Sequence, residues 1–335
     1  MKRKPEEVKV LVSRVFPKVG IDLLKEQGYG VTVWRNERPM TQAELIEKSK
    51  GHTALFCTMS EEINKRFLDR CGHLDIISQF AVGYDNIDIE EATRIGIPIC
   101  NTPDVLSDAT SDVAFGLMIN VSRKMFHLHK SIAKGDWKFF RPSADLGIEL
   151  KNKTLGVFGL GRIGTEMAKR CIGAYNMNVI YNNRSRNLKA EEELGARYVS
   201  FDDLLSESDV LSVHTSLNKE SAGKFDKKAF TAMKPTAIFI NTARGAIHNE
   251  KDLVSALKTG MIWGAGLDVT NPEPMNPLNP LLSMENAAIL PHIGSGTVET
   301  RNKMSLIAAG NIVGFYKGEK IPNLVNTEVK NKSGS

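Results

Sequence analysis

The sequence predicts an α/β protein with two domains, each built on a parallel sheet that helices cover on both faces. Three observations lead to this prediction. Short apolar runs alternate with helical patterns, an order that is typical of parallel strands joined by crossover helices. The alternation occurs in two separate series, and a length of 335 residues fits two domains. Hydrophobic residues make up 41% and charged residues 25% of the chain, which argues against disordered, collagen-like and disulfide-dense proteins.

The first series runs from Val8 to Thr102 and contains five apolar runs. We expect strands in these runs, at residues 8–14, 31–35, 53–59, 74–83 and 97–102. The helical patterns between them mostly end at a glycine, as helices commonly do. Strands and helices thus alternate, and we expect a parallel sheet with crossover helices.

A longer helical pattern extends from Asp104 to Trp137. Its apolar residues recur at spacings of three and four, as on one face of a helix: Val113, Leu117, Val121, Met125 and Leu128. This pattern is longer than a small crossover needs. We therefore expect one long helix that links the two domains or packs against a partner subunit.

The second series begins at Lys153 and contains six apolar runs. The expected strands are residues 154–159, 178–182, 209–214, 236–241, 264–269 and 287–292. Six strands in this order fit a doubly wound nucleotide-binding sheet. An amphipathic helix follows at residues 301–318. Because no flexible linker separates the two series, we expect this last helix to fold back onto the first domain.

Charge and cysteine content argue against several functions. The net charge of +5 arises from 44 basic and 39 acidic residues spread along the chain, so we expect no nucleic-acid partner. The basic residues 2–4 are interpreted as a frayed terminus. The four cysteines lie far apart without a Cys-x-x-Cys pair, which argues against a zinc site or a redox dithiol. We expect no bound metal.

No targeting or membrane segment is expected. Charged residues follow Met1 where a signal peptide would carry an apolar core, and no run of 18 apolar residues is present to span a bilayer. The final Lys332–Ser335 is not a peroxisomal address. We therefore expect a cytoplasmic protein that does not bind membranes.

The strongest local motif is Gly-Leu-Gly-Arg-Ile-Gly at residues 159–164, between an expected strand and an expected helix. Gly159 allows the tight turn, Gly161 lets a pyrophosphate approach the backbone, and Gly164 allows close packing of helix and strand. Arg162 and Ile163 open the helix, whose N-terminal N–H groups favour phosphate. The motif predicts a dinucleotide-binding domain.

The residues at the end of the next strand should determine whether NAD or NADP is preferred. An NAD enzyme places an acid there, but Asn183 stands near the expected position and no carboxylate follows in residues 181–186. Arg184 and Arg186 are suited to neutralise a 2′-phosphate, with Ser185 as a neutral donor. We therefore predict that NADPH and NADP are preferred and that NADH is possible.

Three segments place polar residues at the carboxyl ends of apolar strands, where ligands bind in such sheets. They are residues 241–245, residues 266–269 with Glu273, and residues 291–295. Together they supply a cation, a carboxylate and an imidazole in Arg244, Glu273 and His292. Taken singly, each residue has another explanation, as a surface ion pair, a loop charge or a buried core histidine.

With these motifs in this order, the sequence resembles the D-isomer-specific 2-hydroxyacid dehydrogenases. Within that family it is most similar to glyoxylate/hydroxypyruvate reductases, through VGYDNID, PDVLSDAT and GLDVTNPEP, and the likeness covers about residues 8–324. The resemblance implies a flavodoxin-like substrate domain of residues 8–104 and 296–325, into which a Rossmann dinucleotide-binding domain of residues 105–295 is inserted. The substrate would lie in the cleft between the domains.

The resemblance implies reduction of glyoxylate and hydroxypyruvate to glycolate and D-glycerate, with hydride from the nicotinamide. His292 matches the proton donor of the family, Glu273 the carboxylate paired with it, and Arg244 the substrate-binding cation. A neighbouring carboxylate favours the protonated imidazole. Arg244 is also placed to stabilise charge that develops on the carbonyl oxygen.

The resemblance also implies binding residues in both domains. Val82 and Gly83 match the backbone groups that receive the substrate carboxylate, alongside Arg244 and His292. Thr110 matches a contact to the cofactor phosphate, and Asp268 one that positions the nicotinamide amide. Further cofactor contacts are expected at strand ends and loops: His214, Thr215, Thr242, Ala243 and Gly294.

Two alternatives to this function remain open from the sequence. One is a broad D-2-hydroxyacid dehydrogenase that uses another 2-keto acid. The other is a dinucleotide-sensing corepressor, because such proteins share the fold and retain the same arginine, glutamate and histidine. The long helix and the family likeness both favour a homodimer.

Overall fold

The computed structural model describes residues 3–329. Lys2 of the basic amino terminus and the final Lys332–Ser335 lie outside the described residues. Within them the chain forms two compact units: unit 1 runs from the amino terminus to Leu106 and again from Gly296, and unit 2 is Ser107–Ser295. Each contains a wholly parallel sheet, and the predicted fold class is confirmed.

Unit 1 contains a five-stranded sheet in the order β2-β1-β3-β4-β5, which is the flavodoxin-like order. Its strands are β1 (Lys9–Val12), β2 (Gly30–Val33), β3 (Ala54–Cys57), β4 (Ile76–Gln79) and β5 (Ile99–Cys100). Its helices are α1 (Lys18–Glu26), α2 (Gln42–Ser49), α3 (Lys65–Cys71), α4 (Ile89–Arg94) and α12 (Val298–Lys317). All five strands coincide with the predicted apolar runs, although β2 begins one residue before its run.

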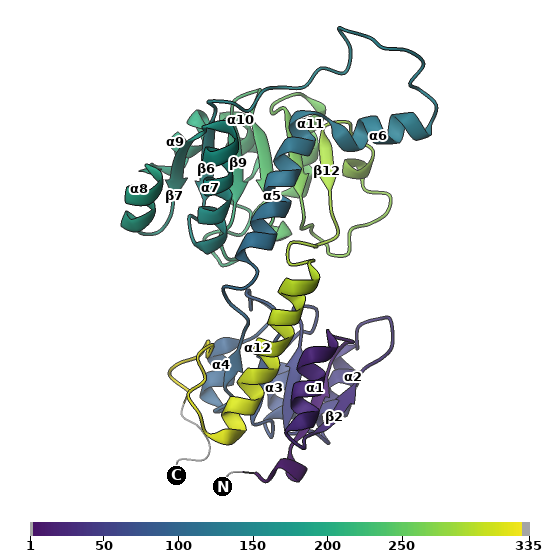
Figure 1. Ribbon diagram of the computed structural model, residues 1–335, viewed down its shortest axis with the longest axis vertical. Coiled ribbons are helices and arrows are strands. Elements are labelled where there is room, and N and C mark those ends of the chain that lie inside the picture. Colours follow the sequence, from purple (N-terminus) through teal and green to yellow (C-terminus); the bar gives the residue numbers. More distant parts are fainter. Residues whose placement is uncertain (1–2, 330–335) are drawn as a thin grey trace. The chain divides into compact units, whose positions relative to one another are not determined.

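Alternate residues of these strands face two different helical layers. Val10 packs in the core shared with α1 and α12, whereas its neighbour Leu11 packs in the core shared with α2, α3 and α4. Helices α1 and α12 lie together on one face of the sheet (Figure 1). A Cβ on Gly20 of α1 would lie 2.3 Å from Ser305 Oγ of α12, so glycine permits this close packing.

Unit 2 contains a seven-stranded sheet in the order β12-β11-β10-β9-β6-β7-β8. Its strands are β6 (Thr154–Phe158), β7 (Asn178–Asn182), β8 (Arg197–Tyr198), β9 (Val210–Val213), β10 (Ile238–Asn241), β11 (Gly264–Leu267) and β12 (Ala287–Ile289). The six predicted strands are present, and the two-residue β8 was missed because it is too short to show a pattern. The strand order reverses between β6 and β9, which marks the usual ligand edge of such sheets.

Helices cover both faces of this second sheet. One core joins the strands to α5 (Ser107–Ser122), α7 (Arg162–Tyr175) and α8 (Leu188–Leu194). The opposite core joins them to α9 (Phe201–Glu207), α10 (Lys227–Ala232) and α11 (Glu250–Lys258). Helices α5 and α7 lie side by side over the sheet (Figure 1).

The prediction of one helix from Asp104 to Trp137 was wrong. The segment forms α5, which ends at Ser122, and a separate α6 (Met125–Ala133). Lys124 between them adopts a left-handed φ of 53°, which a continuous helix does not allow. Apolar spacing continues across this break, so periodicity alone did not reveal it.

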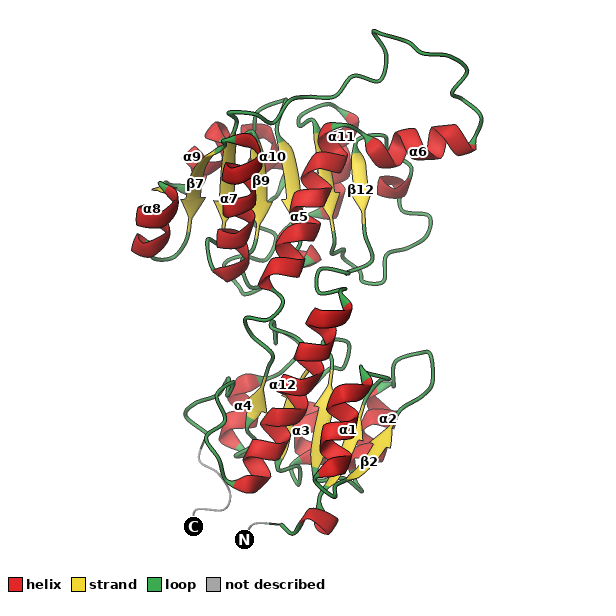
Figure 2. Ribbon diagram, in the orientation of Figure 1, coloured by secondary structure: helices red, strands yellow, loops and turns green. Residues whose placement is uncertain are grey.

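A long loop then joins α6 to β6 and extends away from the sheet of unit 2 (Figure 2). Its aromatic residues Trp137, Phe139 and Phe140 are 71%, 70% and 83% exposed, so they do not belong to the core. Among the described residues, every helix is too short or too polar to cross a bilayer. No three potential ligands among His, Cys, Asp and Glu of residues 3–329 gather closely enough to hold a metal ion.

Candidate active site

The glycine motif lies between β6 and α7, as predicted, and its backbone leaves room for a ligand. Gly159 has a left-handed φ of 99°, and a Cβ there would lie 2.7 Å from Thr215 N. A Cβ on Gly164 would lie 2.7 Å from Gly159 O, so helix and strand pack closely. A Cβ on Gly161 would have no heavy atom of the described residues within 4 Å apart from its own neighbours along the chain. This open cradle at a helix N-terminus fits a dinucleotide pyrophosphate.

Two asparagines hold this loop from the end of β7. Leu160 N donates to Asn183 Oδ1 at 2.7 Å, and Asn183 Nδ2 donates to Leu160 O at 3.4 Å. Asn187 Nδ2 donates to the same carbonyl at 2.9 Å. Asn183, which the sequence places near the position of an acid, therefore fastens the glycine loop.

The two arginines beyond β7 have different surroundings. Arg186 forms an ion pair with Glu191, which also accepts a hydrogen bond from Tyr181 Oη at 2.5 Å. The Arg186 guanidinium, and then the Tyr181 hydroxyl, lower the pKa of Glu191 to about 2. Arg184 and Ser185 are exposed, and Arg184 makes no ion pair with any described residue. Of the two cations, only Arg184 lacks an ion pair with another residue in the described part of the chain.

Two polar residues meet beside the glycine loop at the ends of β9 and β10. His214 Nε2 lies 2.8 Å from Ser212 Oγ, and His214 Nδ1 lies 3.5 Å from Thr242 Oγ1. Burial lowers the pKa of His214 to about 4, so its imidazole is neutral at physiological pH. The backbone of Thr215 follows directly, against Gly159.

Asp268, just after β11, accepts hydrogen bonds from the backbone that follows His292. Its side chain is 1% exposed, Oδ1 accepts from Ile293 N at 2.8 Å, and Oδ2 accepts from Gly294 N at 2.7 Å. Burial raises the pKa of Asp268, against the effect of these two donors. Thr110 of α5 lies at the same place, because a Cβ on Gly294 would lie 3.1 Å from Thr110 Cγ2.

His292 and Glu273 form a direct pair. The Nδ1 atom of His292 lies 2.5 Å from Glu273 Oε1. His292 has a left-handed φ of 54°, which non-glycine residues adopt rarely. The bonds from Ile293 and Gly294 to Asp268 hold this conformation, and no described residue contacts Nε2 through a hydrogen bond.

Arg244 follows β10, on a loop that packs against the segment carrying Glu273. A Cβ on Gly245 would lie 2.1 Å from Thr270 O, so only glycine permits this contact. Strands β10, β11 and β12 are neighbours in a parallel sheet. The three residues of the predicted set therefore follow neighbouring strands at one edge of the sheet.

The predicted carboxylate-binding loop of unit 1 is held by its carbonyl groups. Asn101 Nδ2 donates to Val82 O at 2.9 Å, and Gln79 Nε2 donates to Gly83 O at 2.6 Å. Neither Val82 N nor Gly83 N has a hydrogen-bond acceptor among the described residues. The main-chain N–H groups are thus left for an anion.

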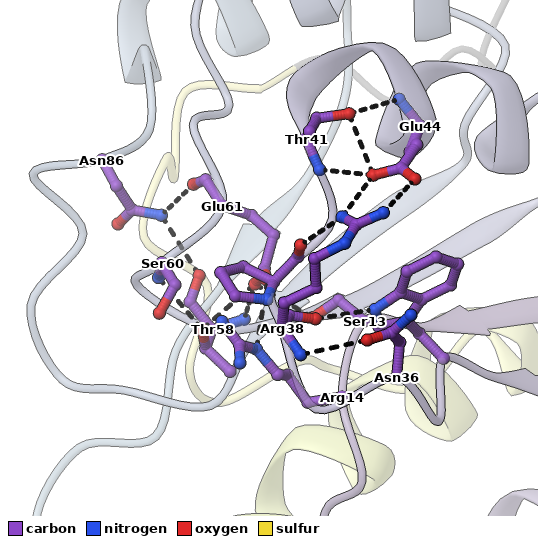
Figure 3. Close-up of polar contacts among 12 residues, drawn as sticks. Ser13, Arg14, Asn36, Arg38, Thr41, Glu44, Thr58, Ser60, Glu61 and Asn86 are labelled. Atoms are coloured by element: carbon purple, nitrogen blue, oxygen red, sulfur yellow. Dashed lines mark hydrogen bonds and ion pairs between the residues drawn. The ribbon is translucent and has the colours of Figure 1, made fainter.

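A polar cluster fastens the neighbouring loops of unit 1, as Figure 3 shows. Glu61 is 2% exposed, and its Oε2 accepts from Ser13 Oγ at 2.9 Å, Thr58 N at 2.7 Å and Thr58 Oγ1 at 3.1 Å. Arg14 Nε lies 3.6 Å from Glu61 Oε1. Glu61 therefore joins the ends of β1 and β3.

Asn86 extends this cluster to the Val82–Gly83 loop. Its Nδ2 donates to Glu61 O at 2.8 Å and to Gln79 Oε1 at 2.9 Å. Sequence reasoning missed Glu61, Gln79, Asn86 and Asn101. Their only signal is that they are polar residues at strand ends, and it does not tell which backbone group each one holds.

Comparisons with known proteins agree with this geometry. Residues 115–294, more than half of the chain, match the family described as D-isomer specific 2-hydroxyacid dehydrogenase, NAD binding domain. A glyoxylate reductase of Thermococcus litoralis is 44% identical over 329 residues, which cover 97% of this chain and 98% of that protein. The chain belongs to the D-isomer specific 2-hydroxyacid dehydrogenases. It is an NAD(P)-dependent oxidoreductase, as predicted.

Solved structures of this dehydrogenase family have the same fold. A glyoxylate reductase from Paecilomyes thermophila is 32% identical with a TM-score of 0.84, over 95% of this chain and 98% of that one. An NADPH-dependent glyoxylate/hydroxypyruvate reductase from Sinorhizobium meliloti, in complex with NADP and malonate, is 28% identical. Its TM-score is also 0.84, over 98% of this chain and 100% of that one.

Proposed function

We propose that this dehydrogenase reduces glyoxylate and hydroxypyruvate to glycolate and D-glycerate with NADPH. The observation that carries the proposal is the His292–Glu273 pair, which follows strands neighbouring that of Arg244 in the dinucleotide-binding unit. The names of the similar proteins support the substrate class, since they are glyoxylate reductases and a glyoxylate/hydroxypyruvate reductase.

The substrate carboxylate needs hydrogen-bond donors. In unit 1 the N–H groups of Val82 and Gly83 serve this role, supported by the bonds that hold the carbonyls of the same residues. In unit 2 the guanidinium of Arg244 binds the keto acid and polarises its carbonyl. A cation near the carbonyl oxygen stabilises the negative charge that develops there during reduction.

Proton transfer is the role of His292. Because Glu273 accepts from Nδ1, the Nε2–H of the protonated imidazole is the proton available to the carbonyl oxygen. Glu273 keeps the orientation of the ring. The bound nicotinamide supplies the hydride. In the reverse direction, the same Nε2 accepts the proton of the 2-hydroxy acid.

The residues proposed to hold the cofactor lie along the sheet edge of unit 2. The pyrophosphate would lie over the glycine loop with Arg162, Ile163 and Thr110 near it. The nicotinamide half would lie near the ends of β9 to β12, at His214, Thr215, Thr242, Ala243, Asp268 and Gly294. Arg184 and Ser185, beside Asn183, would bind the 2′-phosphate.

The cofactor proposal is tested by Arg184→Ala. We expect the Kd for NADPH, measured by quenching of protein fluorescence, to rise about tenfold or more, because one charge-assisted contact is lost. The Kd for NADH should change less than twofold. Lys189→Ala, which removes a nearby exposed cation of α8, is the matched control. Equal effects of Arg184→Ala on both cofactors would contradict the assignment.

We also propose that the protein is a homodimer. The exposed Trp137, Phe139 and Phe140 on the loop after α6 support this, because large apolar groups are usually covered in solution. Sedimentation equilibrium should give twice the chain mass. Replacement of these three residues by serine should shift the protein toward the monomer.

The reaction itself is tested with a panel of keto acids. Initial rates of NADPH oxidation should rank glyoxylate and hydroxypyruvate above pyruvate and a branched keto acid, with glycolate as the product from glyoxylate. A higher rate with another keto acid would reassign the substrate. Tight NADPH binding without turnover of any of the four acids would contradict the enzymatic proposal.

A further inference from the structure

A buried histidine lies next to the Arg244 loop, outside the set of residues predicted from the sequence. His248 follows the 3-10 turn η2 (Gly245–Ile247) and is 2% exposed. Its Nδ1 lies 3.1 Å from Asn241 Nδ2, and its ring packs edge-on to Phe239 with centroids 5.8 Å apart. Nothing in the proposed reaction uses this imidazole directly.

Asn241 connects His248 to the arginine loop. Asn241 is completely buried, its Oδ1 accepts from Ala243 N at 3.0 Å, and its Nδ2 donates to Arg244 O at 2.9 Å. The second hydrogen of Nδ2 is directed to His248 Nδ1. The amide thus holds the backbone on both sides of the Ala243–Arg244 peptide.

Its two backbone contacts set the orientation of this amide, and that orientation requires an acceptor at His248 Nδ1 for the second hydrogen of Nδ2. If the amide were reversed, its oxygen would face Arg244 O and its NH₂ would face Ala243 N, so both contacts would be repulsive. A lone pair on Nδ1 is available only when the proton is on Nε2. Burial keeps the ring neutral, because it lowers the pKa of His248 to about 4.

The other ring nitrogen indicates why a histidine is present. Nε2 is buried and has no hydrogen-bond partner among the described residues. An unmade hydrogen bond in the interior is unfavourable, and an apolar residue of similar size would avoid it. The histidine therefore leaves one hydrogen bond unmade at Nε2 and makes one at Nδ1, with Asn241.

We propose that His248 is a positioning residue that fixes the Arg244 loop through Asn241. His248 does not contact substrate; it keeps the main chain at Arg244 in the conformation from which the guanidinium binds the keto acid. The inference rests on the proposed role of Arg244. A double-mutant cycle with Arg244→Ala distinguishes an error in that role from an error in the role of His248.

The test compares an apolar replacement with one that keeps the acceptor. In His248→Leu, we expect KM for glyoxylate to rise about tenfold, as for loss of a hydrogen bond that orients a charged group, with a smaller change in kcat. In His248→Asn, the side-chain oxygen takes the place of Nδ1, and KM should stay within about threefold of the wild type. The Kd for NADPH should be unchanged in both variants.

A double-mutant cycle shows whether His248 acts through Arg244. In an Arg244→Ala background, His248→Leu should raise KM less than twofold, because the group it positions is gone. Full additivity, or an equal rise in KM for the Leu and Asn variants, would overturn the inference. If Arg244→Ala alone leaves KM unchanged, the proposed function fails first. Should His248→Leu not fold, His248→Val takes its place in the cycle.

Discussion

The strand-edge loops of the two units are held by opposite kinds of hydrogen bonds. In unit 1, the side-chain amides of Asn101 and Gln79 donate to the carbonyls of Val82 and Gly83. In unit 2, the carboxylate of Asp268 accepts from the two N–H groups that follow His292. The first arrangement leaves the main-chain N–H groups of Val82 and Gly83 for an anion. In the second, the main-chain N–H groups are already bonded to Asp268, and the group left for a ligand is the side chain of His292.

This difference indicates how the proposed work is divided. In the proposed function, unit 1 binds the substrate through its main chain, so the identity of the side chain at Val82 should matter little there. Unit 2 would act through side chains whose backbone is fixed by buried polar groups. Replacement of a reacting side chain in unit 2 should therefore have larger effects than replacement of a supporting side chain in unit 1.

Among the binding and supporting residues of the two units, loss of the unit 2 cation should give the largest effect. In Arg244→Ala, kcat/KM for glyoxylate should fall by about 10²–10³, because the charge on the carbonyl oxygen loses its stabilising partner. Arg244→Lys should recover only part of this activity, since lysine keeps the charge but not the forked donor geometry. Steady-state kinetics at saturating NADPH provide the measurement. A fall of less than tenfold in Arg244→Ala would remove Arg244 from the site.

The Asp268 carboxylate tests the way in which unit 2 holds its loop. In Asp268→Asn, one of the two N–H donors faces an NH₂ group, so the left-handed conformation of His292 loses support. We expect kcat to fall by about 10–100-fold, as for the loss of a buried charge-assisted contact. Asp209→Asn, at a carboxylate that accepts from Thr154 N away from this edge, is the control. A wild-type kcat in Asp268→Asn would contradict the role of this contact.

His214, which is partly buried, and His248, which is fully buried, predict a loss of stability in acid. Their folded pKa is about 4 for both His214 and His248, below the ordinary value of about 6.5, so the unfolded chain binds more protons between these values. The stabilisation is present above pH 6.5 and is lost as the pH falls toward 4. From pH 7 to pH 5, each histidine should lower the free energy of unfolding by about 2 kcal/mol.

Urea unfolding of His248→Leu at the two pH values checks this contribution. The variant should lose about 2 kcal/mol less than the wild type between pH 7 and pH 5, because it lacks one of the two groups. An identical pH dependence in both proteins would show that His248 is not held neutral by burial.

Loss of a supporting amide in unit 1 should give the smallest effect. In Gln79→Leu, the Gly83 carbonyl loses its donor, and we expect KM for glyoxylate to rise about fivefold to tenfold with little change in kcat. Tyr316→Phe removes a hydroxyl of unit 1 that donates to Thr53 Oγ1 just before β3, at the opposite edge of the sheet, and it should leave KM unchanged. A fall in kcat larger than the rise in KM for Gln79→Leu would contradict the proposal that unit 1 contributes to substrate binding and unit 2 to the chemical step.

Much of the fold could be predicted because it depends on regular patterns. Apart from the two-residue β8, the strands of both sheets coincide with apolar runs. The glycine motif lies between a strand and a helix, and Gly159 there has a left-handed φ of 99°, which favours glycine. Arg244, Glu273 and His292 could be brought together from the sequence because the ends of parallel strands share one edge. The break at Lys124 could not, since apolar spacing continues through it.

The supporting contacts of the site could not be predicted, because they join side chains to distant main-chain groups. Asn183 looked like a replaced acid, yet its amide holds Leu160. Arg186 looked like a phosphate ligand, yet Glu191 neutralises it. Bonds of this kind depend on the three-dimensional position of single carbonyl and N–H groups, and no periodicity in the sequence reports them.

The claim that a side chain of unit 2 carries out the proton transfer is tested most directly by the single-turnover rate of His292→Ala. The measurement is the rate of NADPH oxidation after mixing the enzyme–NADPH complex with saturating glyoxylate. We predict a rate lower by about 10²–10⁴ than that of the wild type, with an unchanged Kd for NADPH. A rate within tenfold of the wild type would contradict it.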